Sequence, residues 1–192
     1  MFTGIIESLG LVKKVIQEDS NLHLVVESPI SALLKIDQSI AHNGICLTVV
    51  AVEGDTHTVT AIDETIKKTN LGTWKVGSKL NLERCMQMNG RLDGHIVQGH
   101  VDQIGKVVNI QNADGSWIYT VAYEGNAVTV EKGSITINGT SLTVVDSTSN
   151  SFSVHIIPYT YEHTNFHTLQ VGDQVNLEFD IIGKYVAKLM GK

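Results

Sequence analysis

The sequence is short of cysteine and of positive charge, and each shortage excludes a class of protein. Cys46 and Cys85 are the cysteines among 192 residues. They are too few for the disulfide framework of a secreted domain, so reduced thiols in the cytoplasm are expected. The net charge of −6 argues against a nucleic-acid or anionic-membrane partner, because both favour a basic face.

Long apolar runs and ligand-binding motifs are missing as well. No run approaches the ~18 apolar residues of a spanning helix, and residues 1–7 lack the basic region and apolar core of a signal peptide. There is no glycine-rich phosphate loop of the Walker or dinucleotide type. His163 and His167 have the spacing of one helical turn, but they lack the glutamate and third ligand of known motifs and do not indicate a metal site.

The stretch around which the chain is organised occurs twice. Residues 43–50, Asn-Gly-Ile-Cys-Leu-Thr-Val-Val, return as residues 138–145, Asn-Gly-Thr-Ser-Leu-Thr-Val-Val, at an offset of 95 residues. Residues 76–83 match residues 171–178 at the same offset, and no gap is needed between the landmarks. One offset that holds for separate landmarks indicates a duplicated domain, each copy with its own core.

Short apolar segments separated by turns predict that each copy is a closed or nearly closed β-barrel. Asn43-Gly44 is a tight-turn dipeptide between two apolar runs and predicts a hairpin. The second copy is expected to repeat the first up to about residue 179. In the first copy, strands are expected at residues 4–16 with bends at Gly4 and Gly10, and at residues 21–27, 39–52, 57–62 and 79–84.

Two short helices are expected beside the strands of the first copy. One would run from Ser28 to Leu34, with Ser28 as N-cap and Ile30, Leu33 and Leu34 packed inward. The other would span residues 64–71.

A third helix is expected over residues 183–192, where Tyr185, Val186, Leu189 and Met190 recur at helical spacing. A small barrel does not need such a helix, so docking on another subunit is expected; the alternative is a helix folded back on its own barrel. The sequence thus predicts an all-β chain with barrels at residues 1–95 and 96–182 and an oligomerisation helix at residues 183–192.

The informative positions are those at which the two copies differ in chemistry. Cys46 is aligned with Ser141 inside nearly identical flanks, and both side chains are potential nucleophiles. Such differences predict two similar pockets with different functions. At any single position, the alternative is sequence drift where no function constrains the residue. The other contrasting pairs are Asp37 with Lys132, Ile5 with His100, Thr60 with His155 and Cys85 with Asp180.

These residues also have structural explanations. Cys46 is either a functional thiol beside a turn or a small buried hydrophobic residue, the usual role of free cysteine. Ser141 and Thr143 are either site residues or partners of backbone groups beside their turn. His100 is either a site residue or a core histidine. The residues alone leave these alternatives open.

Four segments together resemble riboflavin synthase. They are residues 1–7 (Met-Phe-Thr-Gly-Ile-Ile-Glu), the Asn-Gly-x-Cys-Leu-Thr-Val stretch from Asn43, residues 94–102 (Gly-His-Ile-Val-Gln-Gly-His-Val-Asp) and residues 138–143 (Asn-Gly-Thr-Ser-Leu-Thr). The resemblance covers essentially the whole chain. It implies two tandem six-stranded Greek-key β-barrels and a C-terminal helix that builds a homotrimer.

The resemblance also implies a reaction. Two molecules of 6,7-dimethyl-8-ribityllumazine react by transfer of a four-carbon unit, giving riboflavin and 5-amino-6-ribitylamino-2,4-pyrimidinedione, with no metal or organic cofactor. Each barrel would bind one lumazine, and the working site would pair the N-terminal barrel of one subunit with the C-terminal barrel of its neighbour. Lumazine synthase is a further partner that the resemblance suggests. The rival interpretation is a non-catalytic antenna protein that carries lumazine or flavin on the same fold.

The family's functional residues fall on two sets in this sequence. One pocket would use Gly4, Ile5, Ile6, Lys132, Ser141, Leu142, Thr143, His155, Ile156, Ile157, Pro158, Tyr159 and Thr160. The other would use Cys46, Leu47, Thr48, Thr60, Ala61, Ile62, Asp63, Glu64, Thr65, Gly99, His100 and Val101. The expected catalytic residues are Cys46, His100, Ser141 and Asp180. His100 would be the base that removes a proton from the 7-methyl group, and Cys46 or Ser141 a transient nucleophile or a group that orients water.

Overall fold

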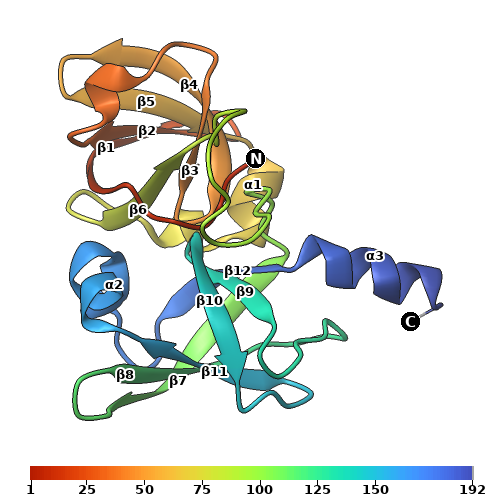
Figure 1. Cartoon of the computed structure of the whole chain (residues 1–192). Helices are drawn as coiled ribbons and strands as arrows, with labels where there is room; N and C mark the ends of the chain where they lie inside the picture. The colour runs from red at the N-terminus through yellow and green to blue at the C-terminus, as the bar shows by residue number, and fades with distance from the viewer. Residues whose placement is uncertain (192) are drawn as a thin grey trace.

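Two closed six-stranded barrels make up the chain in the computed structural model, which describes residues 1–191 (Figure 1). The N-terminal barrel contains β1 (Ser8–Glu18), β2 (Asn21–Glu27), β3 (Ser39–His42), β4 (Ile45–Glu53), β5 (Thr56–Ala61) and β6 (Lys79–Arg84). The C-terminal barrel contains β7 (Gln103–Asn112), β8 (Trp117–Ala122), β9 (Ser134–Ile137), β10 (Thr140–Val145), β11 (Ser151–Ile156) and β12 (Gln174–Phe179).

The two barrels have the same topology. Neighbouring strands follow the order β1-β2-β5-β4-β3-β6 in the first and the equivalent circular order β10-β11-β8-β7-β12-β9 in the second. Each barrel encloses its own apolar core. The expected fold class, tandem Greek-key barrels related by duplication, is confirmed.

The repeated Asn-Gly dipeptides form the expected hairpin turns. Asn43 (φ +45) and Gly44 (φ +79) join β3 to β4, and Asn138 (φ +46) and Gly139 (φ +81) join β9 to β10. Both turn positions require positive φ, which asparagine and glycine tolerate. The turns pack against each other, because a Cβ atom on Gly44 would lie 2.8 Å from the backbone nitrogen of Gly139. The duplicated stretch therefore lies at the contact between the barrels.

Buried asparagine side chains fix the two barrels to each other. Asn81 Nδ2 donates to the Asn138 carbonyl at 2.9 Å, and Asn176 Nδ2 donates to the Asn43 carbonyl at 2.9 Å. The Asn81 amide also meets Asn165, which donates its backbone N–H to Asn81 Oδ1 at 2.7 Å. Because each buried amide finds its partner in the other barrel, the network specifies their relative orientation.

The segments that precede β1 and β7 cross between the barrels. Phe2 N donates to the Val97 carbonyl at 2.7 Å, and Val97 N donates to the Phe2 carbonyl at 3.1 Å. These residues are aligned in the duplication, so their antiparallel pair lies on the local twofold axis that relates the barrels. Each crossing segment consequently lies against the barrel of the other half.

The expected start of the first strand is too early, because β1 begins at Ser8. Gly4 does bend the chain, with φ +78, but it belongs to the crossing segment. Gly10 lies within β1 and is needed for close packing, since a Cβ atom there would lie 2.6 Å from Val26 Cγ1 and 2.7 Å from Leu82 Cδ1.

The helix expected from Ser28 to Leu34 is only one 3-10 turn, η1 (Ser31–Leu33). Ser28 does not cap it, because its hydroxyl is bonded to the Ser31 hydroxyl at 2.8 Å. Ile30 and Leu34 are buried as expected, but Leu33 is 59% exposed. The prediction of a longer helix with Leu33 packed inward was therefore wrong.

The helix expected over residues 64–71 is divided. It consists of α1 (Asp63–Lys68) and η2 (Asn70–Thr73), with a break at Thr69 in extended conformation. The break lets the backbone N–H of Asn70 reach Asn176 Oδ1 at 2.8 Å. In the second barrel α2 (Pro158–His163) and η3 (Asn165–Thr168) repeat this arrangement. A contact with the other barrel thus decides where the helix ends.

The terminal helix α3 (Ile181–Leu189) begins two residues before the expected start at residue 183, because Asp180 caps it by accepting from Ile182 N at 2.9 Å. It points away from both barrels (Figure 1). Its apolar residues are uncovered, with Tyr185 66% and Leu189 86% exposed. Residues 181–189 therefore do not fold back on the barrel; Lys192, the end of the expected helix, lies outside the described residues. No helix within residues 1–191 is long and apolar enough to span a membrane.

Candidate active site

A cavity of about 820 Å³ opens at the side of the C-terminal barrel. Its volume is in the range of pockets that enclose a small organic molecule. Its lining combines a few apolar side chains with hydroxyl, imidazole, carboxylate and ammonium groups. The lining residues are Ile5, Asp93, Gly94, Glu131, Lys132, Ser134, Ser141, Leu142, Thr143, Val145, Asp146, His155, Ile157 and Thr160.

Strand β10 supplies one wall of this cavity, and the N-terminal crossing segment closes on it. Ser141 N donates to the Gly4 carbonyl at 2.8 Å. The approach is close, because a Cβ atom on Gly4 would lie 2.5 Å from Ser141 Cβ. The C-terminal pocket therefore includes Ile5, a residue from the other end of the chain.

Most of the first set of expected residues meets in this cavity. Ile5, Lys132, Ser141, Leu142, Thr143, His155, Ile157 and Thr160 line it. Gly4 contributes its carbonyl oxygen, as described. Ile156 points into the barrel core with no exposed surface. Ile6, Pro158 and Tyr159 do not belong to the lining, and Tyr159 is 68% exposed.

The second set lies at the equivalent place of the N-terminal barrel. Cys46 N donates to the Gly99 carbonyl at 2.9 Å, the counterpart of the bond between Ser141 and Gly4. Gly99 has φ +81, and a Cβ atom on it would lie 2.6 Å from Cys46 Cβ. The crossing segment thereby brings His100 and Val101 to this barrel, where Val101 packs against the core. The half-site around Cys46 in the N-terminal barrel and the half-site around Ser141 in the C-terminal barrel therefore have the same backbone framework.

The other members of the second set divide between the core and the surface. Leu47 and Ala61 are buried in the barrel core, so only their backbone atoms remain for a ligand. Thr60 Oγ1 bonds His23 Nδ1 at 2.8 Å. The remaining members, Thr48, Ile62, Asp63, Glu64 and Thr65, are exposed or half-buried at the end of the barrel and in α1.

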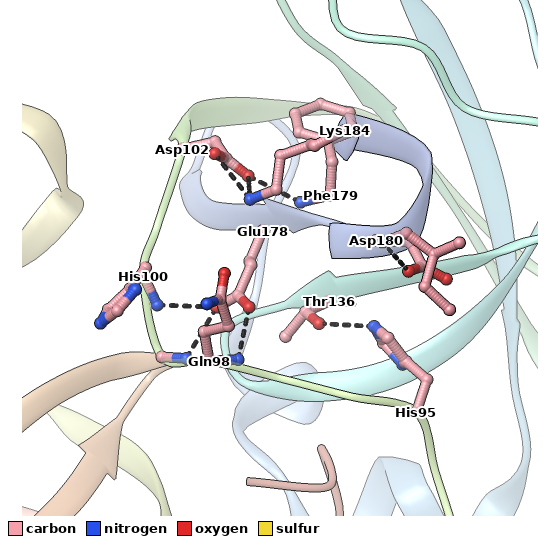
Figure 2. A network of polar contacts seen from close by, with 11 residues as sticks. His95, Gln98, His100, Asp102, Thr136, Glu178, Phe179, Asp180 and Lys184 are labelled. Carbon is pink, nitrogen blue, oxygen red and sulfur yellow. Dashed lines mark hydrogen bonds and ion pairs between the residues drawn. The ribbon is translucent and has the colours of Figure 1, made fainter. Parts of the chain in front are cut away.

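Two buried carboxylates, which the sequence analysis missed, hold the crossing segments in place. Glu83 accepts from the backbone N–H groups of Thr3 at 2.7 Å and Gly4 at 2.9 Å. Glu178 accepts from Gly99 at 2.9 Å and His100 at 2.8 Å (Figure 2). Burial raises the pKa of both carboxyl groups, although the hydrogen bonds oppose this shift. The sequence signal for these two carboxylates was the Asn-Leu-Glu tripeptide that ends both repeated segments, residues 76–83 and 171–178.

His95 is the functional candidate that the expected catalytic set lacks. Its Nδ1 atom lies 2.6 Å from Ser141 Oγ. Its Nε2 atom lies 3.1 Å from Thr136 Oγ1, as Figure 2 shows. Burial lowers the pKa of His95, while the negative charge of Asp180 acts in the opposite direction. The imidazole is therefore neutral at pH 7. The Gly-His pair at residues 94–95 contributed to the family resemblance, but the sequence did not reveal the contact between His95 and Ser141.

The expected catalytic residues His100 and Asp180 are separated within the chain. The His100 side chain is exposed beside the N-terminal half-site, and its backbone is held by Glu178. Asp180 lies on the other side of Glu178, toward His95 (Figure 2). His100 therefore belongs with Cys46, and Asp180 belongs with the half-site of Ser141.

The two cysteines have different environments. Burial raises the pKa of the half-buried Cys46 thiol, so the thiolate is a minor species at neutral pH. Cys85 is exposed, and its thiol donates to the Ser39 carbonyl at 3.3 Å. These surroundings favour Ser141 over Cys46 as the activated nucleophile, because only Ser141 has an imidazole at hydrogen-bonding distance among the contacts of the described chain.

The pair His163 and His167 is engaged with backbone groups. His163 Nδ1 lies 2.8 Å from the Tyr159 carbonyl oxygen, and His167 Nδ1 lies 2.6 Å from the Thr164 carbonyl oxygen. Across residues 1–191, no group of three or more histidine, cysteine, aspartate or glutamate side chains has the geometry to hold a metal ion.

Comparison with known proteins agrees with this arrangement. The family described as the lumazine binding domain matches twice, over residues 3–85 and 98–180. Riboflavin synthase from Actinobacillus pleuropneumoniae is 42% identical, and the alignment covers 100% of this chain and 91% of the relative. The chain belongs to the riboflavin synthase family. It is accordingly an enzyme of the transferase type that acts in riboflavin biosynthesis. Riboflavin synthase from Mycobacterium bovis is 40% identical, over 99% of this chain and 98% of the relative.

Solved structures of the same fold contain ligands related to flavin. LumP complexed with 6,7-dimethyl-8-(1'-D-ribityl) lumazine superposes with a TM-score of 0.85, at 25% identity over 93% of this chain and 99% of LumP. LumP complexed with riboflavin gives a TM-score of 0.86 at 26% identity, over 93% of this chain and 98% of LumP. The duplicated barrel of the riboflavin synthase family therefore has structural neighbours that bind lumazine and flavin.

Proposed function

We propose that this chain catalyses the dismutation of two molecules of 6,7-dimethyl-8-ribityllumazine to riboflavin and 5-amino-6-ribitylamino-2,4-pyrimidinedione. The supporting observation is the cavity in which Lys132, Ser141, Thr143 and His155 meet, in a member of the riboflavin synthase family. The equivalent backbone framework around Cys46 is the proposed second lumazine site.

The two half-sites of one chain would act with those of neighbouring chains. Cys46 lies on the N-terminal barrel beside the crossing segment that contains Gly99. Ser141 lies on the C-terminal barrel beside the crossing segment that contains Gly4. A pair of stacked lumazines requires two pockets that face each other, and the uncovered apolar residues of α3 are a suitable surface for assembly. We propose a homotrimer in which the N-terminal pocket of one subunit faces the C-terminal pocket of the next. Association with lumazine synthase stays a prediction.

The chemistry requires a base and close positioning. His100, with its exposed ring beside the N-terminal half-site, is the candidate base for the acidic 7-methyl group of the substrate. Holding two rings at bonding distance would supply much of the rate, because proximity and orientation contribute up to ~7–11 kcal/mol. No cofactor takes part in this proposal, since the transferred four-carbon unit comes from the second lumazine.

A second candidate function is non-catalytic carriage of lumazine or flavin, and the similarity to ligand-bound LumP favours it. Incubation of the purified protein with the lumazine distinguishes the two functions. An enzyme produces riboflavin absorbance and fluorescence and consumes two lumazines per riboflavin formed. A carrier binds the lumazine without forming riboflavin, and that result would overturn the proposed reaction.

A further inference from the structure

We propose that His23 and Glu18 set the hydrogen-bond polarity of Thr60, so that the N-terminal half-site presents an acceptor oxygen to a donor group of the lumazine. His23 is a positioning residue that acts through Thr60. The inference rests on the proposed function, because it takes the half-site around Cys46 as the second lumazine site. It gives a chemical reason for the difference between Thr60 and His155 in the two copies.

Three side chains on the outside of the N-terminal barrel are joined in a row. His23 Nδ1 lies 2.8 Å from Thr60 Oγ1, and His23 Nε2 lies 2.8 Å from Glu18 Oε2. His23 on β2 is directly opposite Thr60 on β5, and Glu18 ends β1, the strand on the other side of β2. Alternate residues of β2 and β5 are buried in the core, so His23 and Thr60 project outward. The row therefore crosses three neighbouring strands on the outer surface.

The position of Thr60 corresponds to a residue that lines the cavity of the other barrel. Thr60 is aligned with His155 in the duplication, and His155 lines the cavity of the C-terminal barrel. His23 is aligned with Ile118, which lies opposite His155 in the strand ladder. In the C-terminal half-site an imidazole thus faces the pocket directly. In the N-terminal half-site the imidazole lies one strand behind a hydroxyl group.

The carboxylate determines which nitrogen of His23 carries the proton. An ionised carboxylate only accepts hydrogen bonds, so His23 Nε2 donates to Glu18. In the neutral imidazole Nδ1 is then the acceptor, and the Thr60 hydroxyl donates its proton to it. The Thr60 oxygen retains lone pairs for a ligand but has no proton left to donate. The half-site consequently selects a hydrogen-bond donor.

The exposure of the side chains separates the roles of the two positioning groups. The His23 side chain is 22% exposed, whereas the Glu18 side chain is 71% exposed. A contact at so exposed a carboxylate contributes little to stability, because water and salt screen it. Glu18 therefore selects the tautomer without holding the barrel together, and His23 is the stronger determinant of the Thr60 contact. The second copy has Ala113 at the position of Glu18 and lacks this control.

The ligand has two kinds of group that Thr60 is able to bind. Lumazine and riboflavin both have hydroxyl donors on the ribityl chain and an imide N–H on the ring. Either donor suits an oxygen that only accepts. Lumiflavin lacks the ribityl hydroxyls and 3-methylriboflavin lacks the imide N–H, so the two compounds distinguish the sources.

The test measures riboflavin binding at the N-terminal half-site alone, as the concentration that half-protects Cys46 from iodoacetamide. His23→Ile introduces the residue type that the other barrel has at this position, so the barrel should fold. We expect it to weaken protection by about 3- to 10-fold, the range for one hydrogen bond. His23→Asn keeps an acceptor near the place of Nδ1 and should restore protection. Glu18→Gln should have a smaller effect than His23→Ile, and Glu53→Gln, an exposed carboxylate on β4, is its matched control.

Further readouts separate positioning from packing. Thr60→Val removes the hydroxyl at nearly constant shape, and His23→Ile should add nothing to its effect, because the two residues act as a unit. In turnover the KM for lumazine should rise by the same factor, with kcat changed by less than about twofold, since the contact is made in the ground state and the transition state alike. The effect of His23→Ile should disappear with lumiflavin or with 3-methylriboflavin, whichever lacks the donor that Thr60 accepts.

The tautomer is observed directly by ¹⁵N shifts. At about pH 8.5, where histidine is ordinarily neutral, His23 should have a protonated Nε2 and an unprotonated Nδ1. A protonated Nδ1, unchanged protection in His23→Ile, equal losses in His23→Ile and His23→Asn, additive losses with Thr60→Val, or an effect that persists with both analogues overturns the inference while the proposed reaction stands. A wild type in which riboflavin protects Cys46 but no riboflavin forms from lumazine overturns the reaction alone. A wild type without protection overturns the inference together with the second lumazine site.

Discussion

Ser141 donates its backbone N–H to the carbonyl oxygen of Gly4 at 2.8 Å and so joins the C-terminal barrel to the first residues of the chain. The same relationship joins Cys46 to Gly99 in the other barrel. Neither half-site is therefore built by its own barrel alone. Each depends on a crossing segment that a glycine allows to approach closely.

Replacement of Gly4 by alanine tests this close approach. Gly4 has φ +78, and a Cβ atom there would lie 2.5 Å from Ser141 Cβ. Gly54 has φ +60 with no heavy atom within 4 Å of an added Cβ atom, so Gly54→Ala measures the conformational cost alone. We expect about 1–2 kcal/mol of destabilisation for Gly54→Ala, and a larger loss together with weaker riboflavin binding for Gly4→Ala. Chemical denaturation and fluorescence titration provide the two measurements; equal effects of both substitutions would contradict a positioning role.

Glu83→Gln and Glu178→Gln test the buried carboxylates. Each replacement turns one accepting oxygen toward the backbone N–H groups into an NH₂ group, and an unsatisfied buried donor costs about 1–3 kcal/mol. Glu83 holds Gly4 beside Ser141, whereas Glu178 holds His100 beside Cys46. We therefore expect each variant to weaken a different one of two ligand sites in calorimetric titration. A loss of stability with both sites unchanged would limit these residues to a structural role.

A buried histidine pair makes the N-terminal barrel sensitive to acid. His42 Nε2 and His57 Nε2 lie 2.8 Å apart, and His57 Nδ1 bonds the Ser31 hydroxyl at 2.8 Å. Burial lowers the pKa of His57 to about 4, and burial together with the neighbouring His57 lowers that of His42. The aligned residues of the other barrel, Ile137 and Phe152, are apolar.

The sign of the pH effect follows from these shifts. An unfolded histidine binds a proton below about pH 6.5, whereas folded His57 does so only near pH 4. Stability is therefore full above pH 6.5 and falls as the pH decreases to 4, by about 3 kcal/mol for His57 alone. We expect the variant His42→Ile/His57→Phe to lose this acid sensitivity in urea unfolding at pH 7.5 and pH 5. Identical pH dependence of the variant and the wild type would contradict the assignment.

The sequence predicted the barrels because local signals and the duplication agree. The Asn-Gly turns and the alternating strands specify hairpins without help from distant residues, and the second copy confirms the first. The Ser28–Leu34 helix failed because the Ser28 hydroxyl bonds Ser31, whose hydroxyl also bonds the interior His57, instead of capping a helix. The division of residues 64–71 likewise depends on Asn176 in the other barrel. Local propensity does not contain such contacts.

The sequence predicted which residues belong to the candidate site, but it did not predict which of them contact one another. Family resemblance placed Ser141, Lys132 and His155 in one pocket, and the structure brings them together. It also grouped His100 with Asp180 as catalytic residues without separating them between the half-sites. His95 was missed because its role depends on a distance to Ser141, and residues that lie far apart in the sequence reveal no distance.

The apolar face of α3 predicts how the subunits assemble. Lys184 anchors the first turn to Asp102 by an ion pair of 2.9 Å (Figure 2), whereas Val186 and Leu189 are exposed farther along the helix. We expect Val186→Glu/Leu189→Glu to convert a homotrimer to monomers that still bind riboflavin but lose most activity, because the paired site spans two chains. Lys188→Glu is the control on the same helix. Sedimentation measures the assembly, and fully active monomers would contradict the shared site.

The two cysteines offer a test of which half-site contains ligand. Alkylation by iodoacetamide requires a thiolate, and the exposed Cys85 should react faster than Cys46, whose pKa is raised by burial. We expect mass spectrometry to show Cys85 modified first, with little loss of activity, followed by a slow modification of Cys46 that inactivates the enzyme. Riboflavin should protect Cys46 and leave the rate at Cys85 unchanged, and Cys85→Ser should leave only the slow, inactivating phase. If riboflavin protects neither thiol, or if Cys46 is modified without loss of activity, Cys46 is a packing residue of the barrel and the second lumazine site must be sought away from it.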